Sequence, residues 1–196
     1  MVHVQTSQPR SSCLQLVLRC AALTLVAHAN DITYAGEMFS LSSTTFHDGG
    51  RVNTAQVFNE AGCDGGNRSP QLTWRNAPAG TRSFAVTMFD PDAPGRGWWH
   101  WAVADIPAGV TTLPENASAS GAVKSVGAVE ARNDFSTDGY GGPCPPAGKP
   151  HRYVVTVYAL RVDRLGLPPG RPAAMFDHEI TGSALGTAQI TVTYGR

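Results

Sequence analysis

The sequence has few charged residues and almost no lysine. Charged side chains make up 15% of its 196 residues, 15 basic groups balance 15 acidic ones, and Lys124 and Lys149 are the only lysines. A protein that holds nucleic acid on its surface needs clustered basic side chains. The composition therefore predicts that no nucleic acid is a partner.

Long apolar runs, heptads and internal repeats are also missing. No apolar stretch of the sequence reaches the roughly 18–20 residues that a membrane-spanning helix requires, so the chain is not expected to span a membrane. The motifs G-x-S-x-G, H-E-x-x-H and the P-loop are absent as well. The sequence therefore predicts a protein that is not an enzyme, with no catalytic residues, no metal and no cofactor.

Residues 1–29 have the composition of a secretory signal peptide. They contain Arg10 and Arg19 but no acidic residue, and a short apolar run over 20–27 ends in the A-x-A pattern of 27–29. This combination predicts a cleaved signal, a single folded domain over 30–196 and a periplasmic or secreted location. The alternative is an N-terminal segment that does not act as a targeting signal.

Two of the four cysteines, Cys63 and Cys144, lie outside this predicted signal. An even pair in an oxidising compartment favours one disulfide, and both residues lie in Gly-rich segments, where inert core cysteines are uncommon. Two separate free thiols are the alternative.

Short segments of alternating or β-branched residues dominate the rest of the chain. They predict strands over 82–89, 99–106, 152–162 and 189–194, with weaker candidates at 37–46 and 71–74. One short helix is predicted over 172–185, beginning at a proline. Strands that follow one another without alternating helices predict an all-β fold, an antiparallel β-sandwich.

The segment MFDPDAPGRGWWHW, residues 88–101, is unusual in its chemistry. Asp90 comes where a predicted strand ends, in a loop that two prolines make rigid. In a regular strand His100 and Trp101 would point to opposite faces, and Trp98 would share the face of His100. Trp98 is therefore predicted to line a pocket that His100 enters.

The segment GYGGPCPPAGKPHRY, residues 139–153, is the second unusual one. Gly141 and Gly142 would allow two backbone N–H groups to converge on an anion. His151 and Tyr153 are two residues apart at the start of the strongest predicted strand, so they share a face.

Asp90, His100, His151 and Tyr153 together offer the groups of a small anion site. Two imidazoles and a phenol supply hydrogen-bond donors, and a carboxylate can orient an imidazole. The carboxylate would repel a bare anion, unless a histidine is protonated or the ligand carries an ammonium or a P–OH group. The alternative is that each residue has an ordinary structural role.

These two segments resemble motifs of the phosphatidylethanolamine-binding protein family, particularly its bacterial branch of Raf-kinase-inhibitor-like proteins. The similarity extends from about residue 46 to residue 194. It implies a β-sandwich whose pocket takes phosphate-type anions or phospholipid head groups. The pocket residues would be Asp90, Trp98, His100, His151 and Tyr153, with a rim of Gly142, Pro143, Pro145 and Pro146.

The resemblance carries three further implications. One peptide bond of the DPDAP segment would be cis, as is common in the family, and Asp92 would be mainly structural. Cys144 departs from the animal pattern at the rim, which agrees with a Cys63–Cys144 disulfide of the kind that exported bacterial relatives have.

We expect an exported, non-catalytic protein that binds a small anion or a phospholipid head group. The alternative is a metal-dependent hydrolase or lyase that uses Asp90, His100 and His151 as ligands. An inhibitor of a protease or kinase partner is a third interpretation, compatible with the first, and the resemblance is also compatible with a homodimer.

Overall fold

Eight strands form two antiparallel sheets in the part of the chain that the computed structural model describes, which is residue 3 and residues 37–196. The smaller sheet has the order β1-β2-β5, with bounds Ser40–Ser42, Leu72–Arg75 and Thr112–Leu113. The larger sheet has the order β6-β4-β3-β7-β8, with bounds Val129–Glu130, Trp98–Pro107, Ser83–Asp90, His151–Leu160 and Ala184–Tyr194. The prediction of an all-β antiparallel sandwich is confirmed.

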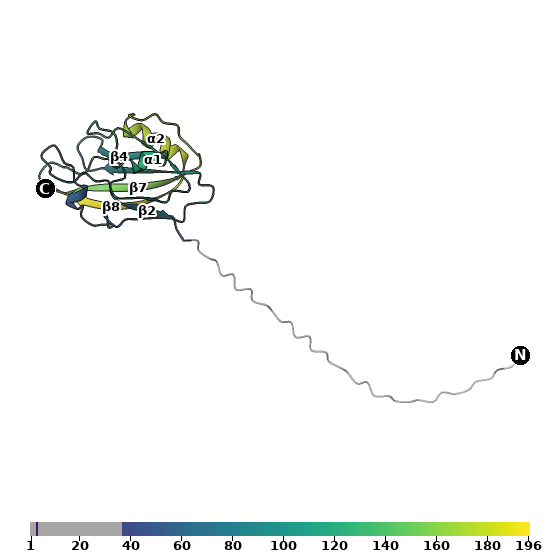
Figure 1. Ribbon diagram of the computed structural model, residues 1–196. Coiled ribbons are helices and arrows are strands. Elements are labelled where there is room, and N and C mark those ends of the chain that lie inside the picture. Colours follow the sequence, from purple (N-terminus) through teal and green to yellow (C-terminus); the bar gives the residue numbers. More distant parts are fainter. Residues whose placement is uncertain (1–2, 4–36) are drawn as a thin grey trace. The chain divides into compact units, whose positions relative to one another are not determined.

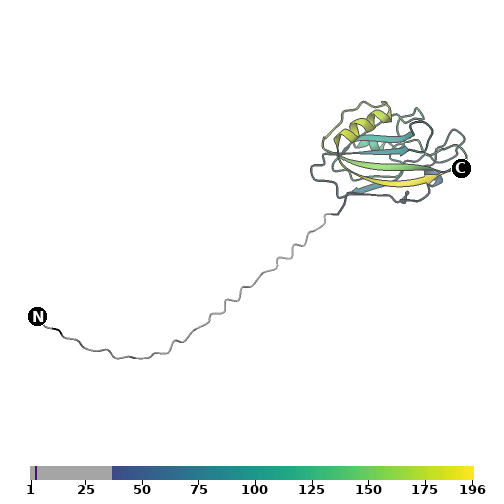
Figure 2. The ribbon, with the colours of Figure 1, turned by 180° about the vertical axis from the view of Figure 1, so that it is seen from behind.

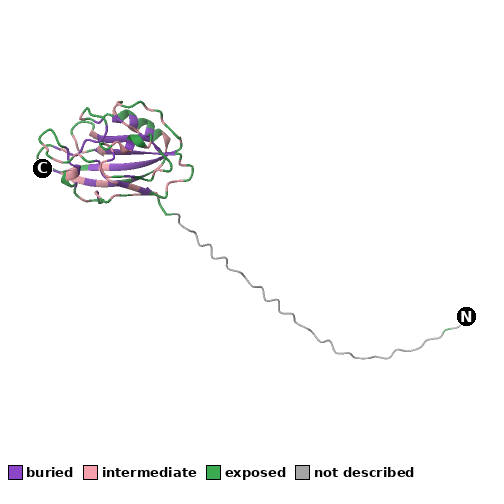
Figure 3. Cartoon of the chain, viewed as in Figure 1, coloured by how far each residue is buried: buried purple, intermediate pink, exposed green. Residues whose placement is uncertain are grey.

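Apolar residues cover both faces of the larger sheet. One cluster lies between the two sheets and includes Trp74 of β2 and Trp101 of β4. The other lies under α2, Ala173–Ser183, and includes Phe176 and Ile180 of that helix. Figures 1 and 2 show α2 and β2 on opposite sides of the large sheet. Figure 3 shows the buried residues concentrated in its central strands, which explains why β3, β4 and β7 read as nearly continuous apolar runs.

The longer predicted elements agree with the structure to within a few residues. The predicted helix over 172–185 ends earlier, because the strand β8 already begins at Ala184. The sequence did not reveal β5, β6, the helix α1 at Ala122–Ser125 or the 3-10 turn η1 at Thr54–Gln56. Each has four residues or fewer, which is too short to show a period.

A β-bulge interrupts β4 at His100. Met88 of β3 is paired with Trp101, whereas its neighbour Phe89 is paired with Trp99, so His100 is the extra residue. As a result, Trp99 packs into the cluster under α2 while Trp101 lies in the cluster between the sheets. The strict alternation assumed from the sequence is therefore wrong at this point.

Three other predictions concern membrane spans, the DPDAP loop and the signal peptide. No helix in the described part of the chain is long and apolar enough to cross a membrane. The expected cis bond in DPDAP is not present, since all peptide bonds between described residues are trans. The predicted signal peptide over 1–29 lies outside the described residues, apart from residue 3.

Candidate functional site

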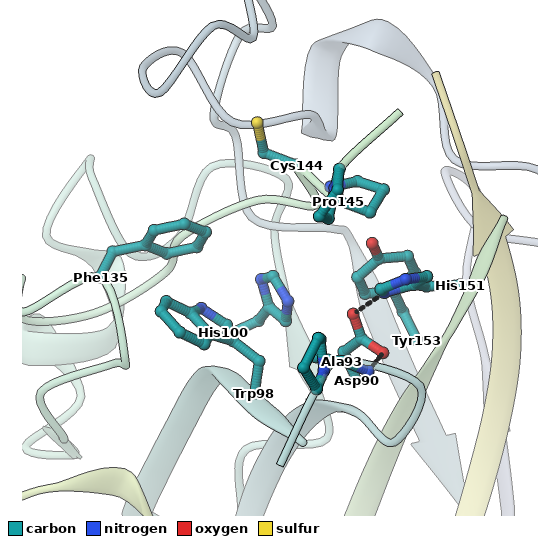
Figure 4. A pocket seen from close by; sticks show the side chains of 11 residues that line it. Asp90, Ala93, Trp98, His100, Phe135, Cys144, Pro145, His151 and Tyr153 are labelled. Atoms are coloured by element: carbon teal, nitrogen blue, oxygen red, sulfur yellow. Dashed lines mark hydrogen bonds and ion pairs between the residues drawn. The ribbon is translucent and has the colours of Figure 1, made fainter. Parts of the chain in front are cut away.

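Three strand ends meet at one edge of the large sheet and enclose a cavity. Asp90 is the last residue of β3, while Trp98 and His151 are the first residues of β4 and β7. Because β3 runs antiparallel to both neighbours, its end lies beside their beginnings. The cavity has a volume of about 240 Å³ and is lined by Asp90, Ala93, Pro94, Trp98, His100, Phe135, Cys144, Pro145, Pro146, His151 and Tyr153 (Figure 4).

Asp90 and His151 form a buried pair on one wall of this cavity. Nδ1 of His151 lies 2.7 Å from Oδ2 of Asp90, which is 3% exposed (Figure 4). Oδ1 of Asp90 accepts hydrogen bonds from the backbone N–H groups of Asp92 and Ala93, at 2.8 and 3.0 Å. The carboxylate therefore holds both its own loop and the imidazole in place, and the Nε2 atom of His151 has no partner among the described residues.

His100 is buried more deeply, and its hydrogen bond defines its tautomer. Its Nδ1 atom lies 2.6 Å from the backbone oxygen of Gly141, which can only accept, so Nδ1 carries the proton. Burial lowers the pKa of His100 to about 4, and the ring is therefore neutral near pH 7. Nε2 is then a lone-pair acceptor with no partner among the described residues.

Two buried donors in the wall of the cavity have no hydrogen-bond partner. They are Nε1 of Trp98 and the hydroxyl of Tyr153, and only two other buried side-chain atoms in the described part share this condition. Burial and the nearby Asp90 raise the pKa of Tyr153, so its phenol keeps its proton. A buried polar group without a partner is costly, which points to a ligand that completes these bonds.

The rim only partly follows the prediction. Pro145 and Pro146 line the cavity, but Gly142 and Pro143 do not. The N–H of Gly141 donates to the backbone oxygen of His100, and that of Gly142 to Oδ1 of Asn67. The predicted convergence of these N–H groups on an anion is therefore wrong, because both already hold the loop.

Gly142 has a structural role instead. A Cβ atom at this position would collide with the backbone oxygen of Gln56. The next residue, Pro143, accepts a hydrogen bond from the N–H of Phe58 through its backbone oxygen. Both residues thus fix the rim loop against the segment that contains η1.

A disulfide and an arginine hold the outer part of the rim. Cys63 and Cys144 are bonded, with Cα atoms 6.0 Å apart, as the sequence predicted. Nε of Arg196 donates to the oxygen of Pro145, and its Nη1 donates to the oxygen of Gly62. The loop around Gly62 and the loop around Pro145 are therefore connected both by the disulfide and by Arg196, beside the cavity.

Phe135 is a wall residue that the sequence analysis missed. Its ring stacks on Phe58 at 4.0 Å between centroids and meets the rings of Trp98 and His100 edge-on, at 5.2 and 5.6 Å. It lies in a loop between β6 and β7, where one aromatic residue has no periodic context. Nothing in the sequence alone connects it with the two motif segments.

The lining residues include no lysine or arginine. Arg152 lies between the lining residues His151 and Tyr153 in the sequence, but its Nε and Nη2 atoms donate to Asp92. These hydrogen bonds hold the pKa of Asp92 well below its usual range. A ligand in the cavity would be held by neutral donors and imidazoles, and Asp92 has a structural role.

Asp90, His100 and His151 line the same cavity but are not arranged as a metal site. Among the described residues there is no group of three or more His, Cys, Asp or Glu side chains placed to hold a metal ion. Asp90 and His151 bind each other, and Nδ1 of His100 faces a carbonyl oxygen. The alternative of a metal-dependent hydrolase gains no support from this geometry.

Comparison with known proteins finds one family. Residues 42–195 match the family model described as phosphatidylethanolamine-binding protein. The chain is 44% identical over 168 residues to the UPF0098 protein YbcL of Escherichia coli K12, covering 83% of this chain and 92% of YbcL. It is 41% identical over 155 residues to YbhB of the same organism, covering 79% of this chain and 98% of YbhB.

Solved structures give the same result. The crystal structure of E. coli YbcL, described as a new member of the mammalian PEBP family, has a TM-score of 0.78 and covers 81% of this chain and 98% of YbcL. A putative phosphatidylethanolamine-binding protein homologue from Chlamydia trachomatis, 28% identical, has a TM-score of 0.68 and covers 81% of this chain and 97% of that protein.

Proposed function

The chain belongs to the phosphatidylethanolamine-binding protein family, and on that premise we propose that its cavity binds phosphate-type anions or phospholipid head groups without chemically changing them. The lining supplies hydrogen bonds but no activated nucleophile. No serine, threonine or lysine lines the cavity, and Cys144 is held in the disulfide, so Nε2 of His100 and of His151 have no nucleophilic side chain to activate. This lining supports binding in preference to catalysis.

One observation carries the proposal, namely the two unpartnered donors at Trp98 and Tyr153. Phosphoryl oxygens are strong acceptors and would satisfy both groups. The cavity volume of about 240 Å³ accommodates a phosphoryl group with a short substituent, since one water molecule takes about 30 Å³ in the liquid. A head group fits this space, whereas a whole lipid does not.

We further propose that the protein is exported to the periplasm or secreted. The charge and the A-x-A pattern of residues 1–29 support this, and so does the Cys63–Cys144 disulfide, because disulfides persist in oxidising compartments.

The experiment is a thermal unfolding assay of the purified protein with phosphate and with phosphoethanolamine. A ligand at about 100 times its Kd adds about 2.7 kcal/mol, which corresponds to a rise in Tm of roughly 5–10 °C for a chain of this size. His151→Ala should lose most of the rise, because the ring lines the cavity. His178→Ala, which removes an exposed histidine on α2, should keep it.

Two results would contradict the proposal. One is the absence of any shift at millimolar ligand in the unaltered protein. The other is an equal shift in His151→Ala and in the unaltered protein.

A further inference from the structure

The cavity presents acceptors as well as donors. On the donor side are Nε1 of Trp98 and the hydroxyl of Tyr153. On the acceptor side is Nε2 of His100, whose proton is on Nδ1 because that atom faces the oxygen of Gly141. A ligand that can only accept hydrogen bonds would pair with the donors of Trp98 and Tyr153. It would then place its own lone pairs against the lone pair of His100, which is unfavourable.

Asp90 adds a second acceptor with a full charge. It receives hydrogen bonds from the N–H groups of Asp92 and Ala93 and from Nδ1 of His151. A carboxylate has about four lone-pair positions, so these three bonds leave one, and the hydroxyl of Tyr153 lies near Asp90 on the same wall. No lysine or arginine among the lining residues offsets the charge toward the cavity.

His151 differs from His100 because its ring is partly open to solvent, with 14% of its side chain exposed. With Nδ1 bound to Asp90, its Nε2 atom accepts a hydrogen bond when the ring is neutral and donates one when the ring is charged. It therefore adapts to the ligand, whereas His100 and Asp90 remain acceptors.

We propose that the cavity binds a ligand that has a phosphoryl group and a hydrogen-bond donor of its own. Anions of similar shape that have no hydrogen-bond donor should bind much more weakly. The inference rests on the proposed function and specifies its ligand class. The donor is either the P–OH group of a phosphate or phosphomonoester or the ammonium group of an ethanolamine head group. Sulfate, which is tetrahedral but unprotonated, would face His100 and Asp90 with lone pairs only.

The test is isothermal titration calorimetry of the purified protein at about pH 6, where phosphomonoesters retain much of their P–OH form. The probes are phosphate, sulfate, phosphoethanolamine, glycerophosphoethanolamine and dimethyl phosphate. Phosphate and phosphoethanolamine should bind at least about tenfold more tightly than sulfate and dimethyl phosphate, because the latter two place their lone pairs against the acceptors of His100 and Asp90.

Glycerophosphoethanolamine separates the two sources of the donor. It is a diester with an ammonium group but no P–OH, so tight binding supports the proposal with a lipid head group as the ligand. Weak binding, together with tight binding of phosphate, supports it with a monoester as the ligand. Sulfate bound within about threefold of phosphate overturns the inference and leaves the proposed function standing, whereas no binding of any probe overturns the proposed function itself.

A pair of variants locates the selectivity. Asp90→Asn replaces a carboxylate oxygen with an N–H donor, so the phosphate-to-sulfate ratio should fall toward one. Asp92→Asn changes the neighbouring carboxylate, which pairs with Arg152 and does not line the cavity, so the ratio should not change. A folded Asp90→Asn protein that keeps the full ratio overturns the role of this acceptor. If that variant does not fold, the ratio in the unaltered protein decides.

Discussion

Replacing Tyr153 with phenylalanine should weaken ligand binding and leave the empty protein as stable as before or more stable. The hydroxyl is buried and unpartnered, and burying such a group without a partner costs about 1–3 kcal/mol. Removing one oxygen from the edge of an existing cavity creates little new empty space. We therefore expect the free energy of unfolding without ligand to stay constant or to rise by about 1–2 kcal/mol.

Binding should change in the opposite direction. A hydrogen bond from a neutral donor to a charged phosphoryl oxygen contributes about 1.5–3 kcal/mol, so its loss should weaken phosphoethanolamine binding roughly 10- to 150-fold. Burial raises the pKa of Tyr153, so the phenol is a donor throughout the pH range in which the protein would be assayed. Urea unfolding measures the first effect and titration calorimetry the second.

The matched control is Tyr158→Phe. Tyr158 lies on the same strand, but its ring belongs to the cluster under α2, on the opposite face of the sheet. This variant should leave the ligand Kd within about twofold of the unaltered protein. If Tyr153→Phe instead lost more than about 1 kcal/mol of stability and kept its affinity, the hydroxyl would be a satisfied structural group and the reasoning would be refuted.

Two further predictions concern stability. The double variant Cys63→Ser with Cys144→Ser should lose about 4–5 kcal/mol in denaturant unfolding, because the bond closes a separation of 81 residues; a loss below about 1 kcal/mol would contradict this chain-entropy argument. Burial lowers the pKa of His100 from 6.5 to about 4, so the unfolded chain binds a proton that the folded protein does not, and stability should fall by up to about 3 kcal/mol from about pH 6.5 down to about pH 4. The decline should be smaller in His100→Asn and unchanged in the exposed control His178→Asn, and a curve equally steep in both variants would argue against His100 as its source.

The strands could be predicted from the sequence because their signal is local. β3 and β7 consist of consecutive apolar and β-branched residues bounded by loops rich in proline and glycine. The convergence of Asp90, Trp98 and His151 was implied by the family resemblance of the two motif segments. The structure supplies the reason, because β3 is antiparallel to both β4 and β7, so its end lies beside their beginnings.

What could not be predicted depends on contacts between distant segments. The N–H of Gly142 looked available for an anion, but Asn67, 75 residues earlier, already accepts its hydrogen bond. Phe135 reaches the cavity from a loop whose path is set by tertiary contacts with Phe58 and Trp98. The bulge at His100 likewise depends on the pairing with β3, which a single strand sequence does not reveal.

That bulge lets one short stretch of β4 serve three parts of the protein. The pairing with β3 shifts by one residue between Trp99 and Trp101, so Trp98 and His100 line the cavity, Trp99 packs against the cluster under α2 and Trp101 lies between the sheets. A deletion within these four residues would therefore disturb the cavity and both apolar clusters together.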